Sequence, residues 1–154
     1  PGEERFILCY IDEVGNNGKS ILSKWLLWNK SDEIAVIDQG SAQQIKSSVV
    51  NKGARKAYII DLTRQRGQAY SEDDLLCVLE SIKNGLVQRQ MFGDGNTLIM
   101  DPPHLIVFTN EPFEYSKLST DRWKVWNIKN KKAIKASITR ENLKKNIKNI
   151  KVLF

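Results

Sequence analysis

A glycine-containing turn between an apolar run and a helical pattern constrains this chain more than any other feature. Residues 6–11 read Phe-Ile-Leu-Cys-Tyr-Ile, residues 15–20 read Gly-Asn-Asn-Gly-Lys-Ser, and residues 21–28 read Ile-Leu-Ser-Lys-Trp-Leu-Leu-Trp. This order predicts a buried strand, a tight turn and a helix whose N-terminal N–H groups face an anion. We therefore expect a phosphate-binding loop at residues 15–20.

The residues of this loop have different expected roles. Lys19 is expected to reach the β- and γ-phosphates of ATP, and the Ser20 hydroxyl is expected to ligate Mg²⁺. The backbone of the turn comes from residues that accept unusual conformations, namely Gly15, Asn16, Asn17 and Gly18. The usual pattern has glycine where Glu13 stands, so we expect the Glu13 side chain to face solvent.

The rest of the chain alternates short apolar runs with helical patterns. We expect strands and helices in turn at residues 34–37, 41–50, 57–60, 71–84 and 105–110. Apolar runs at 86–92 and 97–100 flank a Gly-Asp-Gly-Asn sequence, which predicts a β-hairpin. Strands that alternate with helices predict a three-layer α/β fold with a mainly parallel sheet.

Three residues outside the loop are candidates for the same chemistry. Asp61 ends an apolar run and is placed to hold Mg²⁺, although an Asp at a strand end also forms turns. Asn110 ends a later apolar run, where an amide positions an attacking water or senses the γ-phosphate, or simply turns the chain. Arg122 is the third candidate: it is expected either to stabilise charge on the γ-phosphate across a subunit boundary or to form a surface ion pair with Asp121.

The residue that activates the attacking water is left open by the sequence. ATPases of this pattern often carry a second acid after the metal-binding one, but Leu62 stands there. The candidates are Asp12, Asp38, Glu80 and a group from a neighbouring subunit.

Taken in order, four segments resemble the superfamily 3 helicase domain of replication initiator (Rep) proteins from circular single-stranded DNA viruses. The likeness is strongest to nanovirus-type and alphasatellite-type Reps and related integrated copies. The segments are 15–20, 59–61, 103–110 and 118–123. Residues 61–64 read Asp-Leu-Thr-Arg, which is similar to the Asp-apolar-x-Arg motif of that group. Residues 102–112 resemble its motif C, with Asn110 as the sensor. Residues 119–123 resemble its arginine-finger segment. The resemblance covers about residues 5–128.

The resemblance implies a P-loop NTPase of the AAA+ type with an inserted β-hairpin. It implies an ATP-dependent helicase or translocase of a rolling-circle replication initiator, a ring that is usually hexameric, and ATP at the subunit interfaces. The hairpin corresponds to the DNA-gripping element B′, where Arg89 meets a phosphate of single-stranded DNA and Met91 and Phe92 stack on bases or pack in the core. The alternative is a DNA-binding module with a weak or decayed ATPase, in which nucleotide promotes assembly.

Composition supplies the remaining expectations. Residues 124–154 hold ten of the 24 Lys and Arg residues and one of the 18 Asp and Glu residues, so we divide the chain into an ATPase domain at 1–128 and a basic extension at 129–154. The single histidine, His104, cannot build the metal site of a Rep nicking domain, which we expect to be absent. No run is long enough to span a membrane. Cys9 and Cys77 lie in apolar patterns and indicate reduced core thiols of an intracellular protein, in the host nucleus if the source is viral.

Overall fold

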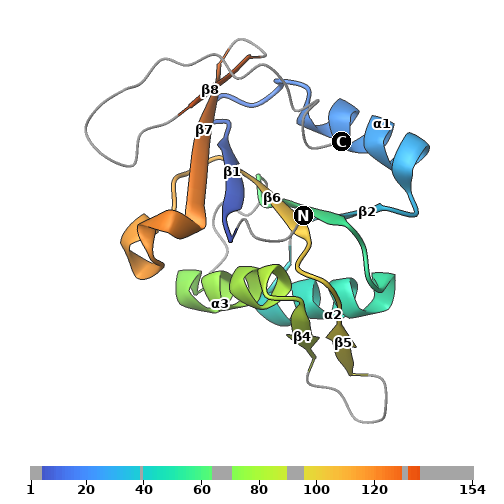
Figure 1. Cartoon of the computed structure of the whole chain (residues 1–154). Helices are drawn as coiled ribbons and strands as arrows, with labels where there is room; N and C mark the ends of the chain where they lie inside the picture. The colour runs from blue at the N-terminus through green and yellow to red at the C-terminus, as the bar shows by residue number, and fades with distance from the viewer. Residues whose placement is uncertain (1–4, 39, 64–70, 90–95, 130–131, 136–154) are drawn as a thin grey trace.

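The computed structural model describes residues 5–38, 40–63, 71–89, 96–129 and 132–135 (Figure 1). The elements follow in the order β1 (Ile7–Ile11), α1 (Lys19–Lys30), β2 (Ile34–Asp38), α2 (Ala42–Lys52), β3 (Ala57–Asp61), α3 (Glu72–Lys83), β4 (Leu86–Gln88), β5 (Thr97–Ile99), β6 (His104–Thr109), η1 (Tyr115–Lys117), η2 (Thr120–Arg122), β7 (Trp123–Lys129) and β8 (Lys132–Lys135). Among the described residues no helix has both the length and the apolar character that crossing a bilayer requires.

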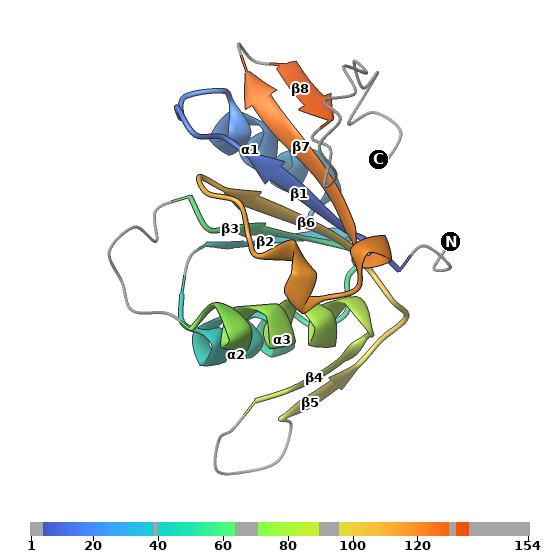
Figure 2. The ribbon, with the colours of Figure 1, turned by 90° about the vertical axis from the view of Figure 1, so that its left-hand side faces the viewer.

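Six strands form one sheet in the order β2-β3-β6-β1-β7-β8. The first five are parallel, and β8 pairs antiparallel with β7 at the edge. Helix α1 lies on one face of the sheet, and α2 and α3 lie on the other (Figures 1 and 2). The predicted α/β fold with a mainly parallel sheet is therefore confirmed. Because β6 lies between β1 and β3, the carboxyl ends of these three strands are neighbours.

The two helices on the same face each begin at a serine that caps the helix. Ser41 accepts a hydrogen bond from the N–H of Gln44, whose side chain in turn accepts one from the N–H of Ser41, which completes a capping box. Ser71 accepts a hydrogen bond from the N–H of Asp74, and three acidic residues occupy the first turn of α3. Local sequence thus fixes where both helices start.

The exposed face of α1 corrects one expectation. Core packing is the default for tryptophan on such a helix, yet the side chains of Trp25 and Trp28 are 58% and 83% exposed, and Leu26 is the residue that the sheet buries.

A second correction concerns Cys77, one of the two cysteines expected in the core. Cys9 is buried in β1, and burial raises its pKa to about 12, while a hydrogen bond with Tyr115 acts in the opposite direction. Cys77 is exposed on α3.

Two strands near the C-terminus were not predicted. β7 lies between β1 and β8, so it is an internal strand of the sheet, and β8 extends the same sheet with residues 132–135 of the basic segment. The spacing of Leu143, Ile147 and Ile150 also predicts a short helix, and these residues lie outside the described part of the chain.

The predicted hairpin is present as the antiparallel pair β4 and β5, which forms a separate small sheet on the α2–α3 side (Figure 2). It is shorter than the two apolar runs. Gly85 precedes β4 with φ +77°, and a Cβ at this position would lie 2.1 Å from the carbonyl oxygen of Met100. Only glycine fits where the hairpin joins α3.

Candidate functional site

The predicted phosphate loop connects β1 to α1 and has an unusual backbone. Gly15, Asn16 and Gly18 have positive φ angles of 81°, 58° and 87°. Gly18 is the N-cap of α1, and its carbonyl oxygen accepts the first helical bond, from Leu22, at 2.9 Å. Asn16 thus adopts the left-handed backbone that the sequence led us to expect, whereas Asn17 is not among the residues with positive φ.

The carboxylate of Asp12, directly after β1, holds this loop in its conformation. It is fully buried and accepts hydrogen bonds from the N–H of Gly15 at 2.8 Å, from the side-chain amide of Asn17 at 2.7 Å and from the ammonium of Lys19. Burial by itself favours the neutral acid, but the bonds from Lys19, Asn17 and Gly15 outweigh it and hold the pKa of Asp12 below its ordinary value. Asp12 is therefore a charged structural anchor of the loop.

Lys19 is held in the same ion pair. Its side chain is 9% exposed and lies at the start of α1, at the mouth of the loop. To reach a phosphate, the ammonium would have to exchange one anionic partner for another, and the positive end of the α1 dipole would favour that exchange. Glu13 is exposed, as predicted.

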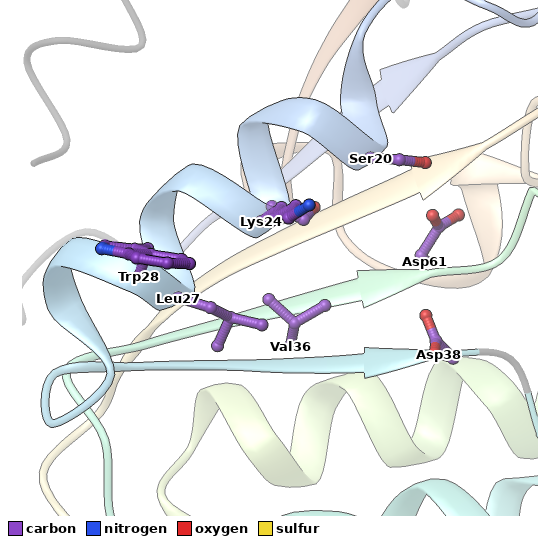
Figure 3. Close-up of a pocket in the computed structure, with 8 residues that line it drawn as sticks. Ser20, Lys24, Leu27, Trp28, Val36, Asp38 and Asp61 are labelled. Carbon is purple, nitrogen blue, oxygen red and sulfur yellow. The ribbon is translucent and has the colours of Figure 1, made fainter.

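A groove of about 490 Å³ opens beside the loop, between α1 and the ends of β2 and β3 (Figure 3). Its polar end holds Ser20, Asp38 and Asp61, and Figure 3 shows the carboxylate of Asp61 pointing toward Ser20. Its other end is formed mainly by apolar side chains, namely Leu27, Trp28 and Val36, while Ser23 and Lys24 complete the lining. The groove thus leads from the phosphate loop to the exposed tryptophan.

Asp61 is held in a fixed orientation at the end of β3. Its Oδ1 atom accepts hydrogen bonds from the N–H of Thr63 at 3.0 Å and from the hydroxyl of Thr63 at 2.6 Å. Its other oxygen is used by neither bond. A hydroxyl and a carboxylate that line one end of a groove are hard oxygen donors of the kind Mg²⁺ prefers, so Ser20 and Asp61 fit the expected metal.

Asn110 lies at the same edge of the sheet. Its side-chain amide donates a hydrogen bond to the carbonyl oxygen of Thr63, which ties the end of β6 to the residues that follow β3. The N–H of Asp12 donates to the carbonyl oxygen of Thr109 at 2.8 Å, which ties β6 to the phosphate loop. Four predicted residues are thereby brought to one edge of the sheet: Lys19, Ser20, Asp61 and Asn110.

Arg122 lies at the opposite edge. It immediately precedes β7, whose first residue, Trp123, pairs with Ile7 at the beginning of β1. Its side chain is 14% exposed, and the guanidinium lies 3.6 Å from the carboxylate of Glu80 on α3. Within one chain, therefore, neither Arg122 nor Glu80 can contact a ligand held by the phosphate loop.

The predicted DNA-binding residues can be followed only in part. The guanidinium of Arg89 donates hydrogen bonds to the side-chain oxygens of Asn96, at 3.2 Å, and of Asn51 at the end of α2. Arg89 therefore braces the base of the hairpin in the isolated chain. Met91 and Phe92 lie outside the described residues.

No protein-family model matches the chain, and the search of curated proteins gives no match either.

Proposed function

We propose that this chain is an ATP-hydrolysing DNA helicase or translocase domain of the AAA+ type, similar to superfamily 3 helicases of rolling-circle replication initiators. One observation carries the proposal. Three neighbouring strands end at the same edge of the sheet and bring together an anion-facing loop with Lys19, a hydroxyl–carboxylate pair in Ser20 and Asp61, and the amide of Asn110. A phosphate loop, a metal-side acid and a polar sensor are the parts that phosphoryl transfer requires.

Each part has a distinct role in this proposal. The N–H groups of the loop bind the phosphates of ATP, and Lys19 leaves Asp12 to contact the β- and γ-phosphates. Ser20 and Asp61 would hold Mg²⁺, which neutralises charge on the phosphate oxygens when it is bound. Asn110 both donates and accepts hydrogen bonds, so it orients water near the γ-phosphate.

The position of Arg122 favours a site completed by a second copy of the chain. A catalytic arginine at the amino edge of the sheet serves a nucleotide only if that nucleotide is bound to a neighbouring subunit. We therefore propose a ring of subunits, with hexamers as the expected form, in which ATP turnover moves the β4–β5 hairpins along single-stranded DNA.

The alternative is a DNA-binding module in which nucleotide mainly promotes assembly. It is favoured by the ion pair between Lys19 and Asp12, which occupies the ammonium of Lys19 in the free chain, and by Leu62 in place of a second acid. The two functions differ in turnover and share nucleotide binding.

Steady-state ATP hydrolysis with Mg²⁺, measured with and without single-stranded DNA, tests the proposal. The parent protein should be stimulated by DNA, and Lys19→Ala and Ser20→Ala should abolish turnover. Ser20 is exposed, so its loss spares the fold, and the exposed Lys30 at the end of the same helix gives the matched control Lys30→Ala. Turnover by Lys19→Ala at the parent rate would refute the assignment of the loop. Binding and assembly without turnover would favour the alternative.

Mixing variants tests the role of Arg122. Arg122→Ala should bind ATP and fail to hydrolyse it. A mixture with Lys19→Ala should recover part of the activity, because some interfaces combine an intact loop with an intact arginine. A mixture as inactive as its components would contradict an arginine that acts across subunits.

A further inference from the structure

A second carboxylate lies beside Asp61 in the groove. Asp38 ends β2 and is the direct register partner of Asp61 at the end of β3. Directly paired residues on neighbouring strands point to the same face of the sheet, and the strands are about 4.8 Å apart. Both side chains line the groove together with Ser20. Figure 3 shows them on the face of the sheet that α1 covers.

The two carboxylates differ in their bonding. Asp61 is oriented by two hydrogen bonds from Thr63. Asp38 is exposed, and within the described part of the chain no hydrogen bond or ion pair holds its carboxylate. One acid is therefore fixed for a static role, and the other is available to a water molecule in the groove.

The other acids considered for this role are engaged elsewhere. Asp12 is fully buried in its ion pair with Lys19, and Glu80 pairs with Arg122 at the opposite edge of the sheet. Residues 39 and 64–70, which adjoin the ends of β2 and β3, read Gln and Arg-Gln-Arg-Gly-Gln-Ala-Tyr and include no acid. Asp38 and Asp61 are the two acids that line the groove.

We propose that Asp38 is the catalytic base of this site, an inference that rests on the proposed ATP hydrolysis. It takes the place of the second acid that the sequence lacks after Asp61, from the neighbouring strand. In the step, the oxygen of a water molecule attacks the γ-phosphorus and its proton passes to Asp38. The bond from the γ-phosphorus to the β–γ bridging oxygen breaks, ADP leaves with the electron pair, and Asp38 releases the proton to solvent.

Asp38→Asn provides the test, because asparagine keeps the shape of an exposed side chain and removes the proton acceptor. A general base contributes about 10²–10⁴-fold to the rate, so kcat with single-stranded DNA should fall within that range. Affinity for a fluorescent ATP analogue in Mg²⁺ should change by less than about threefold, because the phosphates are bound elsewhere. The variant should also retain unhydrolysed ATP through gel filtration, and Asp38→Glu should restore part of the rate.

Three comparison variants define the controls. Asp32→Asn removes an exposed acid in the turn after α1, and Asp101→Asn removes an exposed acid before β6; neither residue lines the groove. Both should hydrolyse ATP like the parent protein. Asp61→Asn should instead lose the Mg²⁺ dependence of nucleotide binding, which separates a metal-side acid from a base.

The outcomes distinguish this inference from the proposed function. Parent-like turnover in Asp38→Asn, with Lys19→Ala inactive, would overturn the role of Asp38 and leave the ATPase intact. Loss of Mg²⁺-dependent binding in Asp38→Asn would also overturn it, because Asp38 would then be a metal ligand. If the parent protein does not hydrolyse ATP, or if Lys19→Ala hydrolyses it at the parent rate, both the role of Asp38 and the proposed ATPase function would be overturned.

Discussion

Replacing Asp12 by asparagine tests the ion pair beneath the loop without any ligand. Asparagine keeps an oxygen that can accept from the N–H of Gly15 and from the amide of Asn17, so the shape of the loop can survive. The charge opposite Lys19 is lost. The substitution therefore isolates the electrostatic part of the arrangement.

The expected cost follows from the burial of the two partners. Removal of one partner from a buried ion pair costs about 3–5 kcal/mol, because the other charge is left without compensation. Asp12 is 0% exposed and Lys19 is 9% exposed, so the ammonium retains some access to water and the lower end of the range applies. A loss of about 3 kcal/mol lowers Tm by about 6–12 °C in a domain of this size.

The assay is urea unfolding of four proteins: the parent, Asp12→Asn, Lys19→Met and the double variant. If the side chains are coupled, the double variant is less destabilised than the sum of the single variants, by about 2 kcal/mol. Effects that add to within about 0.5 kcal/mol would refute the reasoning, since they would mean that the two charges do not stabilise each other in the folded chain.

Three further predictions concern the same fold. The pKa of Asp12 is lowered from 3.8, so the contribution of its charge to stability is complete above that value and is lost as the pH falls through the lower folded-state pKa. The difference in unfolding free energy between the parent and Asp12→Asn, measured by urea unfolding at stepped pH, should therefore shrink below about pH 4. A difference that stays constant with pH would contradict this. Leu26→Ala should cost about 2–5 kcal/mol in thermal unfolding, whereas Trp28→Ala on the exposed face of the same helix should change stability by less than about 0.5 kcal/mol, and equal effects would mean that α1 packs differently. Gly85→Ala should cost more than about 1 kcal/mol, because its methyl group would meet the carbonyl of Met100, and a neutral effect would show that the hairpin joins α3 differently.

Local patterns were sufficient to predict most of the fold. Short apolar runs bounded by polar residues located four of the five parallel strands, β1, β2, β3 and β6, and Ser41 and Ser71 mark the starts of α2 and α3. Asp61 and Asn110 could be placed at one edge because Asp61 ends β3 and Asn110 follows β6, and both strands run in the same direction as β1.

The face of α1 could not be predicted from periodicity. Leu22 and Leu26 are spaced by four residues, and so are Ile21 and Trp25, so two apolar stripes satisfy the helical period equally well. Only the contacts with the sheet decide that Leu26 faces inward and Trp25 faces solvent. Periodicity specifies a helix, and the tertiary contacts specify its rotation.

Two features of the site depended on contacts between distant residues. The position of Arg122 follows from the parallel pairing of β7 with β1, and β7 was not predicted because Lys124 and Asn127 interrupt its apolar residues. The pairing of Asp12 with Lys19 had one signal, an acid directly after the strand and seven residues before the lysine. That signal does not separate a structural carboxylate from a catalytic one.

The unequal covering of the sheet has a consequence for local opening. Helix α3 buries six of its twelve residues, among them Leu79 and Ile82, whereas α1 buries three of twelve, of which only Leu26 is apolar. The helix that carries the phosphate loop is thus the more weakly attached of the two. Its amide hydrogens should exchange with deuterium through low-energy local unfolding, while those of α3 should exchange only when the whole domain opens. Any anion that binds the loop would then slow exchange along all of α1, several turns from the residues it touches.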